Sequence, residues 1–251
     1  MSNNKDLWND IAKEYDERMS DDGNDFHQKL VRPETVRFLN PQHGERILDI
    51  ACGNGIFERY LAVLGVNVVA FDFSKQMIDF AKERCANYLD RVSFSVVDAT
   101  DYDGLIALSG GKPFDKAAAN MALMGFPQIE PLFRAVAQIL KPNGVFVLSV
   151  MHPCFQTPGM SFTEDGNGLI THNYIKPMQT CDQVLSTSDK CTYHWHRSLS
   201  DLLGTAFHAG FAMDGIAEPV YGEGERSHHL IWENAPLAIV IRLRKIEENR
   251  R

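Results

Sequence analysis

The stretch Ile47-Leu48-Asp49-Ile50-Ala51-Cys52-Gly53-Asn54-Gly55 predicts a buried strand that turns sharply into a helix. Gly53 and Gly55 permit positive φ angles and leave room for a ligand to approach the backbone. A helix that begins near Ile56 directs its unpaired amides and the positive end of its dipole toward that ligand. In an open α/β sheet, ligands bind at the carboxyl ends of the strands, where this turn lies. A glycine pair alone is weak support, because any tight strand-to-helix turn can require it.

The rest of the chain alternates short apolar runs with helical stretches from Arg46 onward, which is typical of a parallel sheet with crossover helices. An amphipathic helix around 7–15 and a second one that begins at Pro33 precede this sheet. The predicted strands are 46–50, 67–72, 92–97, 114–119, 144–150, 211–220 and 237–244. The predicted helices that follow are 56–64, 74–88, 129–140 and 197–209.

The domain organisation follows from this pattern, because 251 residues suit a single domain. We expect an N-terminal helical lid at 1–40 and a core formed by 41–150 and 197–245. The segment 151–196 is rich in Pro, Gly, Thr, Asn and His and has no clear period. We expect it to form an insertion that caps the substrate, with a mobile surface loop as the alternative.

Polar residues close the strands that follow the glycine turn. Asp72 ends the second predicted strand, at the distance where an acidic residue accepts hydrogen bonds from ribose hydroxyls. Asp98 ends the third, where its carboxylate or the amide of Ala99 can meet an adenine ring, and the fourth ends at Asn120-Met121. Each acid could instead cap the following helix. Together beside one glycine turn they favour a nucleoside site.

The class of nucleoside depends on the position where dinucleotide-binding turns carry a third glycine. Glu58 stands there, and Asp49 lies four residues before Gly53. Carboxylates repel a pyrophosphate but tolerate a positively charged sulfonium. The sequence therefore favours a cationic, phosphate-free nucleoside over NAD.

These residues resemble the class I S-adenosylmethionine-dependent methyltransferases, particularly the small-molecule type similar to the enzymes of ubiquinone and menaquinone biosynthesis. The similarity extends from Tyr15-Asp16-Glu17 through the glycine turn, Asp72 and Asp98-Ala99. It continues through 114–121 to Leu140-Lys141-Pro142-Asn143-Gly144. Ala51 departs from the glycine that many relatives carry, and no Asn-Pro-Pro-Tyr type sequence follows the fourth strand, which weakens a nucleic-acid or protein substrate.

The resemblance implies a Rossmann-like three-layer αβα sandwich with strand order 3-2-1-4-5-7-6 and the seventh strand antiparallel. It also implies S-adenosyl-L-methionine as cofactor, S-adenosyl-L-homocysteine as product, and in-line methyl transfer to an O, N or C nucleophile of a small molecule. A non-catalytic protein that binds either compound is the alternative, and an NAD-dependent dehydrogenase is a third reading. The cofactor-binding residues that it implies are Tyr15, Asp49, Ala51, Cys52, Gly53, Gly55, Asp72, Phe73, Met77, Asp98, Ala99, Asn120 and Met121.

Methyl transfer also requires the acceptor to lose a proton, for which His is the usual side chain near neutral pH. The catalytic candidates are His152, Tyr193 and His194, with His196 behind them. Arg197 and Glu218 are candidates to bind polar substrate groups. The pairs His194-x-His196 and His228-His229 have no acidic residues at ligand spacing, so we expect no metal.

Composition limits the partners. The formal net charge of -8 with scattered basic residues disfavours nucleic acid. The acidic amino end is unlike a secretory signal, and the longest apolar runs are too short to cross a bilayer, so we expect a cytoplasmic protein with no membrane span. Five cysteines without close pairing predict reduced thiols. The sequence does not indicate the oligomeric state.

Overall fold

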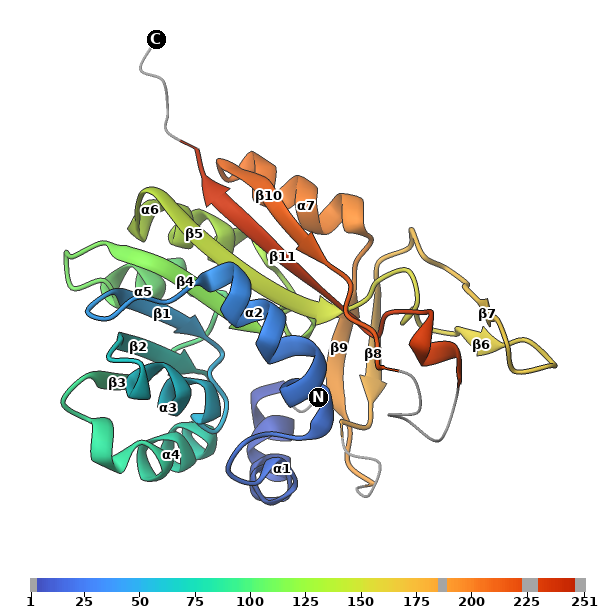
Figure 1. The fold of residues 1–251 in the computed structure, drawn as a ribbon, viewed down its shortest axis with the longest axis horizontal. Helices are drawn as coiled ribbons and strands as arrows, with labels where there is room; N and C mark the ends of the chain where they lie inside the picture. Colours follow the sequence, from blue (N-terminus) through green and yellow to red (C-terminus); the bar gives the residue numbers. More distant parts are fainter. Residues whose placement is uncertain (1–3, 185–188, 223–229, 247–251) are drawn as a thin grey trace, which may run out of the picture.

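The computed structural model describes residues 4–184, 189–222 and 230–246. Its central sheet runs in the order β10-β11-β5-β4-β1-β2-β3 (Figure 1). Strand β11 is antiparallel to both of its neighbours, and the pairs among β1 to β5 are parallel. The predicted order and the antiparallel last strand are confirmed. The seven strands are β1 (Arg46–Ile50), β2 (Asn67–Asp72), β3 (Val92–Val96), β4 (Phe114–Asn120), β5 (Leu140–Met151), β10 (Phe211–Ala217) and β11 (Ala238–Lys245).

Helices cover both faces of the sheet and complete three layers (Figure 1). Because side chains alternate along a strand, Ile47 of β1 enters one core while Leu48 and Ile50 enter the other. Buried apolar runs on both faces are what a doubly covered parallel sheet requires. One face carries α2 (Arg32–Leu39), α3 (Ile56–Val63) and α4 (Lys75–Arg84), and the other carries α5 (Tyr102–Ala107), α6 (Glu130–Ile139) and α7 (Leu199–His208).

The amino-terminal helix α1 (Asn4–Met19) lies beside α4 and the strand β9 (Thr192–His196), with Ile11 and Ala12 buried. After a turn, a π-helical segment, Phe26–Val31, runs directly into α2. The predicted second helix is therefore present but begins earlier than Pro33. A 3.6-residue period does not anticipate the wider π-helical turn.

The segment 151–196 contains two antiparallel strand pairs that were not predicted, because its sequence has no clear period. These are β6 (Ser161–Phe162) with β7 (Leu169–Ile170), and β8 (Met178–Asp182) with β9. The short helix α5 was also not predicted, although Asp101 caps it by accepting from the Gly104 amide at 3.0 Å. Strand β5 begins four residues before the predicted Gly144, and β10 ends at Ala217 rather than at Val220.

The expectation that all five cysteines are reduced is wrong for two of them. Cys181 and Cys191 form a disulfide, with their Cα atoms 5.5 Å apart. The antiparallel register of β8 and β9 brings them together, and two cysteines ten positions apart give no signal of this in the sequence. Cys52, Cys85 and Cys154 are free. Among the described residues, no helix has the length and apolar character needed to cross a bilayer.

Candidate functional site

The glycine turn between β1 and α3 has the positive φ angles that Gly53 and Gly55 permit, and Ala51 adopts one as well. Ala51, Gly53 and Gly55 have φ angles of 53°, 56° and 85°. A side chain on Gly55 would lie 2.7 Å from Cα of Ala81, so α4 packs directly against the turn. A side chain on Gly53 would meet no atom within 4 Å, so open space lies above this residue. Gly55 therefore closes the packing behind the turn, and Gly53 leaves room in front of it.

Asp72 joins the end of β2 to this turn. Its carboxylate accepts from the Gly53 amide at 3.1 Å and from the Ser74 amide at 2.8 Å. The N-cap of α4 is Ser74, whose hydroxyl accepts from the Met77 amide, so Asp72 does not cap this helix. Burial raises the pKa of Asp72 to about 6, although the amides that it accepts from act in the opposite direction.

Two further buried carboxyl groups, Asp49 and Glu58, lie next to the turn, and Asp49 also lines the cavity in front of it. Asp49 is 2% exposed and Glu58 is 0% exposed, and Oδ1 of Asp49 and both carboxyl oxygens of Glu58 have no hydrogen-bond donor. Burial raises the pKa of Asp49 to about 6. Burial and the charge of Asp49 raise the pKa of Glu58 well above its usual range. Among the described residues, no neighbouring cation offsets the burial of these two carboxyl groups.

A small cavity of about 90 Å³ opens in front of the turn. Burial, together with the charge of Asp72, raises the pKa of Tyr15 to about 12, so its hydroxyl stays protonated. Asn120 accepts from the Thr35 hydroxyl at 2.9 Å, while its buried Nδ2 has no partner. The lining residues are Tyr15, Met19, Gly23, His27, Val31, Arg32, Asp49, Ala51, Cys52, Gly53, Asn54, Ile56, Phe57 and Asn120.

A larger cavity of about 270 Å³ shares Ala51 with the small one and is mostly apolar, with five aromatic side chains among its thirteen lining residues. Its charged residue is Asp98, which is exposed and accepts from the amide and hydroxyl of Thr100 at 2.8 and 2.7 Å. Asp101, not Asp98, caps α5. The lining residues are Asn4, Ala51, Phe71, Phe73, Val97, Asp98, Ala99, Gly125, Phe126, Pro127, Gln179, Tyr193 and Trp195.

The structure brings most of the predicted cofactor-binding residues to one place. The residues that line either cavity are Tyr15, Asp49, Ala51, Cys52, Gly53, Phe73, Asp98, Ala99 and Asn120. Four others support these walls from outside the lining: Gly55, Asp72, Met77 and Met121. Met77 is 1% exposed and Met121 donates its amide to Ser149 at 3.0 Å.

Helix α1 contacts the glycine turn through its polar face. Asp16 accepts from the Asn54 side chain at 2.8 Å and pairs with Arg84 at 2.8 Å. The hydroxyl of Ser74 donates to Asn9 at 2.6 Å. These contacts place Tyr15 against the small cavity, as the resemblance implies for its position.

The catalytic candidates on strand β9 point to opposite faces of the strand. Tyr193 lines the larger cavity together with Trp195. Because side chains alternate along a strand, His194 and His196 lie on the opposite face. His194 pairs there with Asp182 at 3.4 Å, and burial lowers its pKa. His196 contacts the Tyr174 carbonyl oxygen at 2.7 Å.

His152 lies after β5, is 1% exposed and lines neither cavity. Its Nδ1 accepts from the Cys154 amide at 3.2 Å, so Nε2 carries the proton and donates to Glu218 at 2.7 Å. Arg197 donates to the carbonyl oxygens of Leu123 and Pro127 at 3.2 and 2.9 Å. His152, Glu218 and Arg197 therefore have partners within the chain.

Sequence reasoning missed several lining residues. Arg32 is the arginine of the small cavity, and its neighbour His27 has a pKa lowered to about 4 by burial and by the charge of Arg32. Asn4 and Gln179 line the larger cavity but come from α1 and β8. The periodicity of the sequence does not indicate that these two elements lie near each other. Phe126 could have been predicted as a lining residue, because it follows closely after Asn120 at the end of β4.

Among the described residues, no group of three or more His, Cys, Asp or Glu side chains is placed to hold a metal ion. The pair His228-His229 lies outside the described residues.

Comparisons with known proteins agree with this geometry. Residues 47–144 match the methyltransferase domain family. A demethylmenaquinone methyltransferase of Clavibacter sepedonicus is 31% identical over 196 residues, which cover 75% of this chain and 71% of that protein. A ubiquinone biosynthesis O-methyltransferase of Xanthomonas axonopodis pv. citri (strain 306) is 29% identical over 122 residues, about half of each protein.

Among solved structures, an S-adenosylmethionine-dependent methyltransferase of Mesorhizobium loti superposes with a TM-score of 0.70 at 23% identity. The superposition covers 85% of this chain and 96% of that one, which shows that the two share a fold.

Proposed function

Because the chain belongs to the class I S-adenosylmethionine-dependent methyltransferases, we propose that it transfers the methyl group of S-adenosyl-L-methionine to an O, N or C nucleophile of a small molecule. The observation that carries this proposal is the pair of cavities that meet at Ala51. One is lined by polar and charged residues that include Tyr15, Asp49 and Arg32, and the other is mostly apolar, with five aromatic side chains. This division matches a donor with a charged amino-acid end and a flat nucleoside end.

The small cavity holds the methionine end in this proposal. Arg32 binds the carboxylate, and the hydroxyl of Tyr15 supports it. The carboxylate of Asp49 faces the positive charges of the donor, its ammonium and sulfonium groups. Two unpartnered buried atoms, Oδ1 of Asp49 and Nδ2 of Asn120, belong to lining residues and fit a ligand with both donor and acceptor groups.

The adenosine end occupies the larger cavity. Asp72 accepts from the ribose hydroxyls while keeping its bonds to the Gly53 and Ser74 amides, since a carboxylate has about four lone-pair positions. Phe73 packs on the adenine ring, and Asp98 and the amide of Ala99 bind its edge. The open space above Gly53 admits the bond between the two ends.

The donor supplies an electrophilic methyl group on a positively charged sulfur. The protein's part is to hold the acceptor in line and to exclude water. Tyr15 cannot act as a base near neutral pH, because its pKa is raised to about 12 by burial and the charge of Asp72. Of the three catalytic candidates, Tyr193 is the one that lines a cavity, and we propose that it contacts the bound ligands.

Methyl transfer is tested by incubating the protein with donor carrying a deuterated methyl group and fractionated metabolite extracts. Transfer produces a small molecule with the heavier methyl group and an equal amount of S-adenosyl-L-homocysteine, measured by mass spectrometry. Donor binding without any labelled product across broad extracts would favour the alternative, a non-catalytic binding protein. The negative net charge and the relatives' names support a small-molecule acceptor, which stays a prediction, as does the cytoplasmic location.

A further inference from the structure

The strand pair β8–β9 forms one wall of the larger cavity and carries the disulfide on the same face. Directly opposed residues of an antiparallel pair share a face, and here Gln179 opposes Trp195 while Cys181 opposes Tyr193. Cys191 lies two positions before Tyr193 and so shares this face as well. The Cys181–Cys191 bond is therefore adjacent to the side chains that line the cavity.

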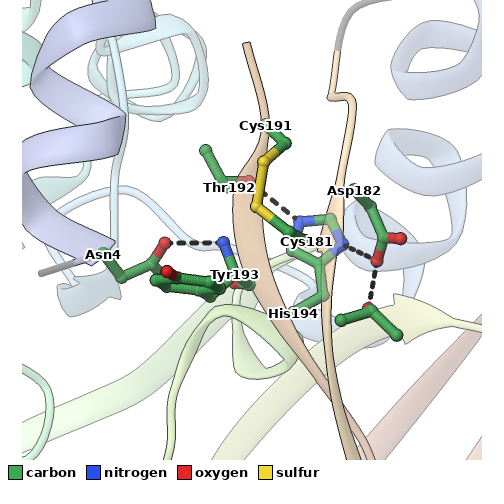
Figure 2. Close-up of a disulfide and its surroundings, with 8 residues drawn as sticks. Asn4, Cys181, Asp182, Cys191, Thr192, Tyr193 and His194 are labelled. Carbon is green, nitrogen blue, oxygen red and sulfur yellow. Dashed lines mark hydrogen bonds and ion pairs between the residues drawn. A yellow bond between two sulfur atoms is a disulfide. The ribbon is translucent and has the colours of Figure 1, made fainter. Parts of the chain in front are cut away.

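The side chain of Asn4, the first described residue of α1, is hydrogen-bonded to the backbone of this wall. Figure 2 shows its side chain directed at Tyr193 beside the disulfide. Oδ1 of Asn4 accepts from the Tyr193 amide at 2.8 Å, and Nδ2 donates to the Tyr193 carbonyl at 3.2 Å. Nδ2 also donates to the carbonyl of Gly125 at 3.1 Å, so one 6% exposed side chain joins three parts of the cavity.

A two-stranded sheet is marginally stable by itself, so β8–β9 depends on such attachments. Lys190 adds a second one to α1, where it donates to the Asp10 carbonyl at 2.8 Å and to Glu14 at 3.0 Å. The disulfide joins the two strands covalently next to these contacts. If that bond opens, Cys181 and Cys191 no longer fix the spacing of the strands at Tyr193.

We propose that Asn4 and the Cys181–Cys191 disulfide together position the Tyr193–Trp195 wall against the bound donor, so that donor affinity depends on the redox state of the disulfide. Asn4 is a positioning residue, since it acts through the backbone of Tyr193. The inference rests on the proposed function, because it assumes that the donor occupies the larger cavity.

The redox step is a thiol–disulfide exchange with a dithiol. A dithiol such as dithiothreitol gives up two electrons and two protons as its thiols form an intramolecular disulfide. The Cys181–Cys191 bond breaks, and each sulfur takes one proton to become a thiol. Cys181 is exposed, so the reductant can reach the bond.

The first measurement counts reactive thiols in the denatured, air-oxidised protein. Three of the five cysteines should react, namely Cys52, Cys85 and Cys154. Reaction of all five would overturn the proposal. Calorimetry then compares S-adenosyl-L-homocysteine binding to the oxidised and the dithiothreitol-treated protein, and we expect reduction to raise Kd about fivefold or more.

Variants separate this effect from a general loss of structure. The double variant Cys181→Ser, Cys191→Ser should bind like the reduced protein and no longer respond to dithiothreitol. Cys154→Ser, a free cysteine of the same segment, should keep the full response. Asn4→Ala should weaken binding about fivefold or more and alter the change in tryptophan fluorescence on ligand binding, to which Trp195 contributes, with the circular dichroism spectrum unchanged.

Equal Kd values for the oxidised and reduced forms would overturn the inference while leaving the proposed function intact. Absence of binding by the oxidised protein would instead contradict the proposed function.

Discussion

Asp49 provides a test in which stability and binding should change in opposite directions. Burial raises its pKa from 3.8 to about 6, so the empty folded chain resists its ionisation. At about 1.4 kcal/mol per pKa unit, the difference between these values corresponds to about 3 kcal/mol. This penalty is absent below about pH 4, where both states are protonated, and builds up as the pH rises through the interval to about 6.

Asp49→Asn removes the charge, and its amide can donate to the unpartnered oxygens of Glu58. We therefore expect the empty variant to be more stable than the parent by about 2 to 3 kcal/mol near pH 8, and by roughly half of that near pH 5. The corresponding rise in Tm near pH 8 is roughly 5 to 10 °C. Donor affinity should fall by roughly 1 to 3 kcal/mol, because the carboxylate no longer faces the cationic ligand.

Urea unfolding and thermal scans at both pH values measure the first effect, and calorimetry measures the second. Asp115→Asn is the matched control. Burial raises the pKa of Asp115, but hydrogen bonds from Lys141 and the Arg46 amide outweigh it and lower the pKa overall. Its ionised form is therefore stabilising, and the control should lose stability near pH 8. A destabilised Asp49→Asn protein at both pH values would refute the reasoning.

Three further predictions concern the walls of the site. Gly55→Ala should lower the free energy of unfolding by roughly 2 to 4 kcal/mol, because its side chain would lie 2.7 Å from Ala81, while Gly53→Ala should cost about 1 kcal/mol in urea unfolding. Asp72→Ala should weaken S-adenosyl-L-homocysteine binding by roughly 1 to 3 kcal/mol in calorimetry, and an unchanged affinity would remove Asp72 from the site. His152→Ala should destabilise the fold by about 2 kcal/mol and leave donor affinity unchanged, since both ring nitrogens of His152 bond to residues that line neither cavity.

The central sheet was predictable because its strands are buried on both faces and separated by regular helices. The turn at Gly53 and Gly55 was also predictable, because positive φ angles and close packing favour glycine at these positions. Asp72 and Asp98 could be located by their place at strand ends. Local sequence was therefore sufficient to predict the site residues that lie between one strand and the helix that follows it.

The cavity wall from β8–β9 was not predictable in this way. The strand that carries Tyr193 and Trp195 is bonded through its backbone to Asn4, almost two hundred positions away, and local sequence does not indicate this contact. The separation of His194 from the cavity likewise depends on strand register. Arg32 follows a π-helical segment whose phase differs from that of the predicted helix.

The most direct test of the account is a calorimetric titration of the unmodified, oxidised chain with S-adenosyl-L-methionine, S-adenosyl-L-homocysteine and NAD. We predict saturable binding of the first two and no heat from NAD near pH 8, because the ionised carboxylates of buried Asp49 and Asp72 oppose a pyrophosphate. Binding of NAD without binding of either sulfur nucleoside would contradict it.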